Sequence, residues 1–154
     1  NYEKLLKDIK KGVEKSRRKI SDLDLVANIP VLITKDENDS RKKKIGRSLA
    51  IRLLWERNTL RDLGWNKEIP NEFSQSDMIV DESISKKLEQ EADKIPSEIT
   101  EQIAAIGKPS EIIEVLEKYK KMGAKNFLIK FLGPINTDDL KKFNSEIIQV
   151  MKNA

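Results

Sequence analysis

The chain contains no cysteine and no histidine among its 154 residues. Without cysteine it forms no disulfide and has no thiolate nucleophile, and without either residue it lacks the usual zinc ligands and the imidazole general base. Any chemistry must therefore come from carboxylates, lysines, hydroxyls, backbone amides or a bound cofactor.

Long apolar runs and aromatic residues are also scarce. No apolar run approaches the roughly 18 residues that a membrane-spanning helix needs, and no signal-peptide pattern is present, so we predict a cytoplasmic protein with no membrane partner. Charged residues make up 36% and aromatic residues 5% of the chain, a composition that resembles thermophile proteomes. The chain begins at Asn1 rather than Met, which we interpret as a piece of something longer.

Positive charge is concentrated in two clusters, KSRRK at 15–19 and RKKK at 41–44, whereas 66–101 is acidic. Basic clusters bind phosphate backbones in some proteins and are solvated helix faces in others. No aromatic side chains are interleaved with these lysines, and no helix-turn-helix or zinc pattern accompanies them. We therefore favour solvated helix faces and predict no nucleic-acid partner.

Helical and extended patterns alternate along the chain. Within the run LVANIPVLI, Pro30 lacks a ladder donor, so we expect a bulge, a strand end or irregular pairing there. Asp36 and Thr137 are the expected N-caps of the second and last long helices. The predicted elements are a helix over 1–20, a strand over 25–33, a helix from 36 to 64, an irregular insertion over about 65–95 that includes a polar helix at 81–94, a short helix from 96, a strand over 103–106, a helix over 109–123, a strand over 127–131 and a helix from 137.

This alternation predicts an α/β fold with about three parallel strands, each followed by a helix and lying side by side in sequence order. So small a sheet leaves two open edges and apolar surface exposed. We therefore expect that the chain is not a stable free monomer. Either a second copy pairs with it as a homo-oligomer, or the remainder of a larger barrel completes it.

Three segments together resemble a known family: DLDLVANIPVLITKDENDSRKKK, IPSEITEQIAAIGKPSEIIEVLEKYKKMGAKNFLIKF and NTDDLKKFNSEIIQVMKN. They are similar to the C-terminal part of the bacterial luciferase-like flavin and deazaflavin oxidoreductases, above all the archaeal methylene-tetrahydromethanopterin reductase branch. The resemblance implies a partial (β/α)8 TIM barrel, in which residues 1–154 form a single C-terminal segment running from the helix after strand five to helix eight. A whole barrel needs about 250 residues.

The resemblance also implies a function, namely hydride transfer with FMN or the deazaflavin coenzyme F(420). The parent family includes oxidoreductases and monooxygenases, and we do not expect this segment to be active alone. The implied phosphate-binding residues are Ala105, Ile106, Gly107 and Lys108, of which Lys108 replaces a threonine usual in the family. Alternatively, Gly107 and Pro109 only form a tight turn between strand and helix. No catalytic or metal-binding residue is assigned.

Two carboxylate pairs, Asp36 with Asp39 and Asp138 with Asp139, are candidates for acid and base chemistry. Both pairs fall in predicted first helical turns, where exposed amides and the helix dipole favour acids, so we interpret them as capping residues.

Three further residues are candidate ligand contacts. Asn28 either points into a barrel pocket or is a satisfied interior amide or a bulge residue, and Trp55 and Trp65 are interpreted as core or interface anchors. Two classes of function remain open: part of a redox enzyme whose cofactor carries the chemistry, or a non-catalytic binding or assembly module with a partial-barrel fold.

Overall fold

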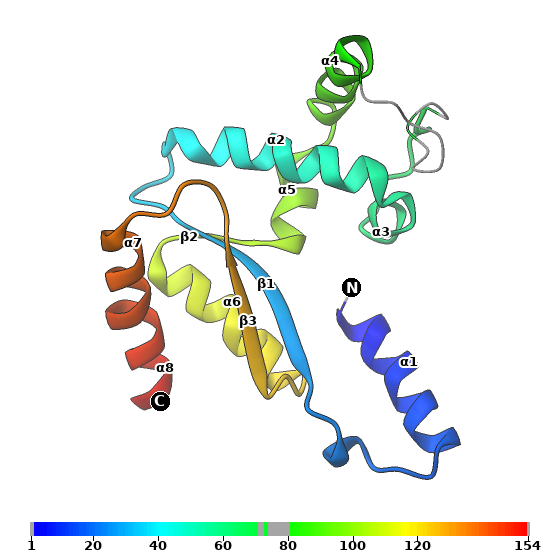
Figure 1. Cartoon of the computed structure of the whole chain (residues 1–154), viewed down its shortest axis with the longest axis vertical. Coiled ribbons are helices and arrows are strands. Elements are labelled where there is room, and N and C mark those ends of the chain that lie inside the picture. Colours follow the sequence, from blue (N-terminus) through cyan, green and yellow to red (C-terminus); the bar gives the residue numbers. More distant parts are fainter. Residues whose placement is uncertain (1, 71–72, 74–80, 154) are drawn as a thin grey trace. The chain divides into compact units, whose positions relative to one another are not determined.

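The computed structural model describes residues 2–70, 73 and 81–153 (Figure 1). It divides into two compact units, one built from Asn1–Lys35 and Ala105–Ala154 and the other from Asp36–Ala104. No helix in the described part of the chain is both long enough and apolar enough to cross a bilayer.

The first unit is an α/β layer structure. Its elements are α1 (Tyr2–Lys15), the 3-10 turn η1 (Ile20–Asp22), β1 (Val26–Ile33), β2 (Ala105–Gly107), α6 (Pro109–Lys121), β3 (Asn126–Phe131), α7 (Thr137–Lys142), the π-helical turn η4 (Phe143–Ile148) and α8 (Gln149–Asn153). The three strands form one parallel sheet. The predicted α/β class, parallel strands and following helices are thus confirmed.

The order of the strands differs from the prediction, because β1 lies in the centre with β2 on one side and β3 on the other. The expected side-by-side arrangement in sequence order is wrong. The chain leaves β1 toward β2 and then crosses back over β1, by way of α6, to reach β3. Consecutive strands of a (β/α)8 barrel are neighbours, whereas β2 and β3 here are separated by β1.

Pro30 lies inside β1 without the irregularity expected from the sequence. On the β2 side Thr34 N donates to Gly107 O at 2.8 Å, and on the β3 side Leu132 N donates to Val31 O at 2.8 Å. Alternate residues of a strand direct their backbone groups to opposite neighbours, so Pro30 faces the β2 side. Pairing with β2 begins only at Val31, so the missing amide of Pro30 removes no ladder bond.

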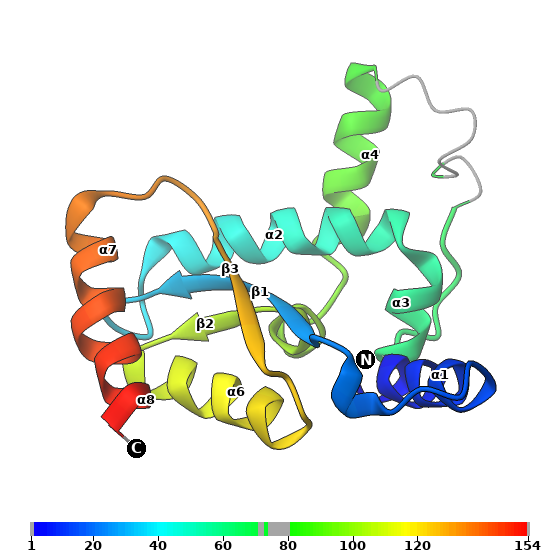
Figure 2. The ribbon, with the colours of Figure 1, turned by 60° about the horizontal axis from the view of Figure 1, so that its bottom comes forward.

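One face of the sheet carries the core of this unit. The odd-numbered side chains of β1 are buried against α6 and the last helix, in a cluster of Ala27, Ile29, Val31, Ile33, Ala105, Ile112, Leu116, Ala124, Phe143 and Ile147. Figure 2 shows α6 running along this face. The rings of Phe131 and Phe143 meet edge to face at 5.0 Å between centroids, which ties the last helix to β3.

The N-terminal helix α1 contacts α6 through an aromatic pair. The rings of Tyr2 and Tyr119 lie 5.0 Å apart in an edge-to-face arrangement. Burial raises the pKa of both phenols, and at Tyr119 the neighbouring Tyr2 adds to the increase. The predicted helix over 1–20 ends at Lys15, shortly before Arg17 takes a positive φ of 56°.

The second unit is helical over its described residues. Its elements are α2 (Ser40–Trp55), α3 (Arg57–Asp62), α4 (Glu82–Ala92), α5 (Ser97–Thr100) and the 3-10 turn η3 (Glu101–Ile103). They enclose a core of Ala50, Leu53, Leu54, Leu60, Trp65, Ile69, Phe73, Leu88, Ala92, Ile95 and Ile99. The predicted anchor Trp65 and the helix at 81–94 are confirmed, and Phe73 is buried in the same core. Residues 71–72 and 74–80 of the predicted irregular insertion lie outside the described residues.

The long helix predicted from 36 to 64 is two helices. It begins later, with Asp39 rather than Asp36 as N-cap, and it breaks at Glu56, whose ψ of 57° is not helical. The expected end holds, since Gly64 takes a φ of 99° that favours glycine.

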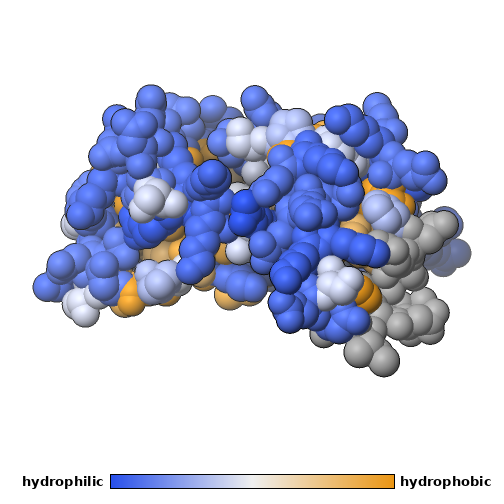
Figure 3. All heavy atoms as spheres, turned by 90° about the horizontal axis from the view of Figure 1, so that it is seen from above, coloured by the Kyte–Doolittle hydropathy of each residue, from blue (hydrophilic) through white to orange (hydrophobic). Residues whose placement is uncertain are grey.

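The surface seen in Figure 3 is covered mostly by hydrophilic residues, with apolar residues in small patches between them. This distribution agrees with the 36% of charged residues in the sequence.

Candidate functional site: the carboxyl edge of the sheet

The four residues implied in phosphate binding lie at the end of β2 and at the start of α6. Ala105 and Gly107 are buried, Ile106 is half-buried and Lys108 is exposed. Ala105 and Gly107 pair with Val31 and Ile33 of β1. Their backbone groups are therefore hydrogen-bonded to β1. The first amide beyond the sheet, at the N-terminus of α6, is that of Lys108.

That amide is already bound by the chain itself. Lys108 N donates to Oε2 of Glu111 at 2.7 Å, as in a capping box. A Cβ on Gly107 would lie 3.0 Å from Cδ and 3.1 Å from Cβ of Glu111 and would overlap its carboxylate oxygen. A side chain at position 107 would therefore displace the Glu111 carboxylate, which accepts from the Lys108 amide where a bound anion could otherwise do so.

The N-terminus of α7 is capped in the same manner. Asn136 Oδ1 accepts a hydrogen bond from Asp139 N at 2.8 Å, so Asn136 is the cap and the expected Thr137 is the first helical residue. Gly133, with a φ of 80°, turns the chain between β3 and this helix. Both helices that follow the edge strands therefore carry their own acceptor at the amide end.

The end of the central strand differs from both, in a way that the sequence analysis does not predict. Thr34 is 4% exposed, and its Oγ1 is buried without a hydrogen-bond partner among the described residues. Strand alternation directs the Thr34 side chain to the face opposite α6, because Ile33 and Val31 face α6. A buried hydroxyl without a partner costs about 1–3 kcal/mol, so a donor or acceptor from a ligand would be favoured there. The only sequence signal is a polar residue directly after an apolar run.

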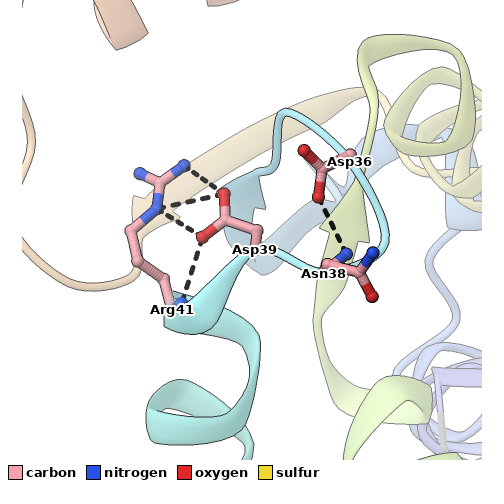
Figure 4. Close-up of polar contacts among 4 residues, drawn as sticks. All are labelled: Asp36, Asn38, Asp39 and Arg41. Atoms are coloured by element: carbon pink, nitrogen blue, oxygen red, sulfur yellow. Dashed lines mark hydrogen bonds and ion pairs between the residues drawn. The ribbon is translucent and has the colours of Figure 1, made fainter.

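The first carboxylate pair, which belongs to the helical unit, serves local structure. Asp39 accepts from Arg41 N at 3.0 Å and forms an ion pair with Arg41 Nη2 at 2.8 Å, whereas Asp36 accepts from Asn38 N at 2.8 Å (Figure 4). The two carboxylates bind different partners, which supports the turn and capping interpretation for this pair.

The second carboxylate pair lies in the first turn of α7, as predicted. Asp138 Oδ1 is 3.9 Å from Lys141 Nζ, and Asp139 contributes the amide that Asn136 caps. In the described part of the chain, no three acidic side chains are grouped closely enough to hold a metal ion.

The remaining candidates lie in the core or on the surface of their own unit. Trp65 is 8% exposed in the core of the helical unit and Trp55 packs against that core, so their interpretation as anchors is confirmed. Asn28 is exposed on the side of the sheet away from α6 and pairs in regular register with Leu128, so it is neither an interior amide nor a bulge residue.

The basic clusters lie at helix ends. Residues 15–19 follow α1 and are exposed, and RKKK forms the first turn of α2. Lys43 and Lys44 are exposed at the positive end of that helix, where cations are unfavourable.

Scans of protein-family models, of curated proteins and of solved structures find no match to this chain.

Proposed function

We propose that the chain is part of an oxidoreductase and that it contributes phosphate contacts for an FMN or F(420) cofactor at the carboxyl edge of its sheet. The observation that carries the proposal is the buried hydroxyl of Thr34, which has no partner among the described residues and stands at the end of the central strand. In open parallel sheets, ligands bind beyond the carboxyl ends of the strands, where the chain connections diverge.

The residues at this edge of the sheet meet the requirements of a cofactor phosphate in part. The Thr34 hydroxyl can donate to a phosphate oxygen, and the exposed Lys108 ammonium can supply positive charge. The Lys108 amide does not fit as it stands, because Glu111 holds it. A bound flavin or deazaflavin would supply the hydride chemistry, and these residues would only hold and orient it.

A second candidate is the non-catalytic binding or assembly module. Glu111 favours it, because its carboxylate fills the position next to Gly107 and makes the β2–α6 turn complete without a ligand. The open edges of a three-stranded sheet favour it as well.

Cofactor titration of matched threonine variants separates the two candidates. Thr34 and Thr100 are both almost fully buried, but Thr100 Oγ1 donates to Ser97 O at 2.9 Å whereas Thr34 Oγ1 has no described partner. If Thr34 serves a cofactor, Thr34→Val weakens binding of FMN or F(420) while Thr100→Val retains it. If Thr34 is only structural, Thr34→Val raises the melting temperature and leaves binding unchanged.

Charge reversal at Lys108 is the complementary test. Lys108→Glu weakens binding if the side chain contacts the phosphate, and the effect shrinks at high salt because exposed charges are screened over roughly 10 Å at 0.1 M. If the parent chain binds neither cofactor at millimolar concentration, the assembly-module candidate replaces the oxidoreductase proposal.

A further inference from the structure

The outer edge of β3 offers a full strand of unpaired backbone. β3 is the terminal strand, and Asn126 N and Leu132 N donate toward β1. Alternation therefore turns the amides and carbonyls of Phe127, Ile129 and Phe131 outward, and no described strand pairs with them. The segment contains no proline and a single charge, so it lacks most of the features that protect edge strands.

The side chains beside this edge form a short stripe on the face away from α6. Leu128 is 58% exposed, in the middle of β3. Lys130 is exposed at one end, and at the other end Asn126 Nδ2 donates to Asp24 Oδ1 at 2.7 Å. The stripe thus has the Lys130 ammonium at one end, Leu128 in the middle and the Asp24 carboxylate at the other end, where Lys125 Nζ is held by the carbonyl oxygens of Ser21 and Leu23.

We propose that this edge binds a second copy of the chain, with the two β3 strands antiparallel about a two-fold axis at Leu128. A two-fold axis inverts the stripe, so Lys130 of one copy meets the Asp24 carboxylate of the other. Leu128 then faces Leu128 of the second copy, and Lys130 faces Asn126 beside Asp24. Moving the axis to Ile129 would place Lys130 against Leu128 and lose this match.

The same register also pairs the outward backbone groups of the two β3 strands and their side chains on the α6 face. Phe127 lies opposite Ile129 of the second copy, and both direct their backbone groups outward, so each such pair exchanges two hydrogen bonds. Their side chains form an aromatic to β-branched pair on the α6 face, a favourable cross-strand combination. The result is a six-stranded sheet, close to the mean of about 5–6 strands. This inference does not depend on cofactor binding.

Sedimentation of the parent and of Leu128→Lys tests the association. The parent is expected to sediment at twice 17.7 kDa at low micromolar concentration. Leu128→Lys places two like charges opposite each other, so the dissociation constant rises at least about tenfold. Because Leu128 is exposed, the circular dichroism of the variant stays unchanged. A single compact species of 17.7 kDa from the parent chain overturns the proposal.

Single cysteines in this cysteine-free chain test the register. Leu128→Cys places two sulfurs at a non-hydrogen-bonded pair, where Cα atoms are about 4.5 Å apart and a disulfide can form. Val26→Cys is the matched control, because Val26 is 53% exposed on the same face but one strand farther from the axis in each copy. Oxidation is expected to link the first variant and leave the second monomeric on a non-reducing gel. Equal cross-linking of both, or cross-linking of Ile129→Cys in place of Leu128→Cys, overturns the proposed pairing.

Discussion

At the scale of single residues, the turn from β2 into α6 shows what sequence alone can reach. Pro109 and Gly123 mark the two ends of α6 as predicted, because their backbone preferences are local. The contact between Gly107 and Glu111 could not be predicted, since it depends on the rotamer of one exposed side chain. The burial of Thr34 depends on tertiary packing and was missed for a related reason.

The Gly107–Glu111 contact predicts a non-additive pair of substitutions. Gly107→Ala displaces the Glu111 carboxylate and Glu111→Ala removes it, so each loses the same cap and lowers the free energy of unfolding by about 1 kcal/mol. The double variant is expected to lose about as much as either single variant, because both remove one interaction. Urea unfolding of the four proteins measures this cycle. Losses that add in full would show that Gly107 is required for a reason other than Glu111.

The tyrosine pair predicts a loss of stability at alkaline pH. The pKa of Tyr119 is raised above its ordinary value of 10.0 in the folded chain. The stability that comes from the neutral Tyr119 phenol in the folded chain is therefore present in full below pH 10.0. It is lost as the pH rises through the pKa of Tyr119 in the folded chain. Denaturant unfolding on both sides of this pH should show the fall, and Tyr119→Phe should reduce it. Because the chain has two tyrosines, both in this contact, tyrosinate absorbance reports the pair directly.

At the scale of elements, the sequence predicts which segments are helices and which are strands, but not which strands lie next to each other in the sheet. Hydrophobic periodicity identified β1, α6 and β3 because it reflects the burial of each segment by itself. Strand order depends instead on how the connections cross, and β2 pairs over only three residues, so the sequence carried little signal for its place. The break at Glu56 within an otherwise periodic helical segment had no sequence signal either.

The packing of α2 on α4 is reinforced by an ion pair whose strength is testable. Arg47 donates from Nε and Nη2 to the two oxygens of Asp93 at 2.8 and 2.7 Å. Both side chains are more than one third exposed, so Arg47→Gln is expected to lower stability by only about 0.5–1 kcal/mol. The loss should diminish in high salt. Arg52→Gln, which breaks the pair between α2 and its C-cap Glu56, is the control and should cost about 0.3–0.5 kcal/mol.

At the scale of the whole molecule, the division into two units with separate cores is the main feature. The first unit is interrupted in sequence, since Asp36–Ala104 stand between β1 and β2. This stretch is the crossover that a parallel pair requires, which commonly takes a dozen or more residues and is here a helical unit with its own core.

Separate cores predict separate responses to core substitutions. Leu53 and Ile112 are each fully buried, the first in the helical unit and the second in the α/β unit. Each substitution by Ala is expected to destabilise its own unit by about 2–5 kcal/mol. Hydrogen exchange should then accelerate mainly over 36–104 for Leu53→Ala and mainly in the remainder for Ile112→Ala. Equal acceleration throughout the chain in both variants would show one cooperative unit.

The place of β1 in the sheet also sets the order of events during synthesis. β1 is the central strand, yet Val31 pairs with Ala105 and Val26 with Asn126, residues that leave the ribosome long after it. The helical unit is contiguous in sequence, so it can fold before β2 and β3 have been synthesised and can pair with β1. At about 5–20 residues per second, synthesis of the residues up to β3 takes several seconds or more after β1 has been made. During that time an apolar strand stays exposed to chaperones and to other nascent chains.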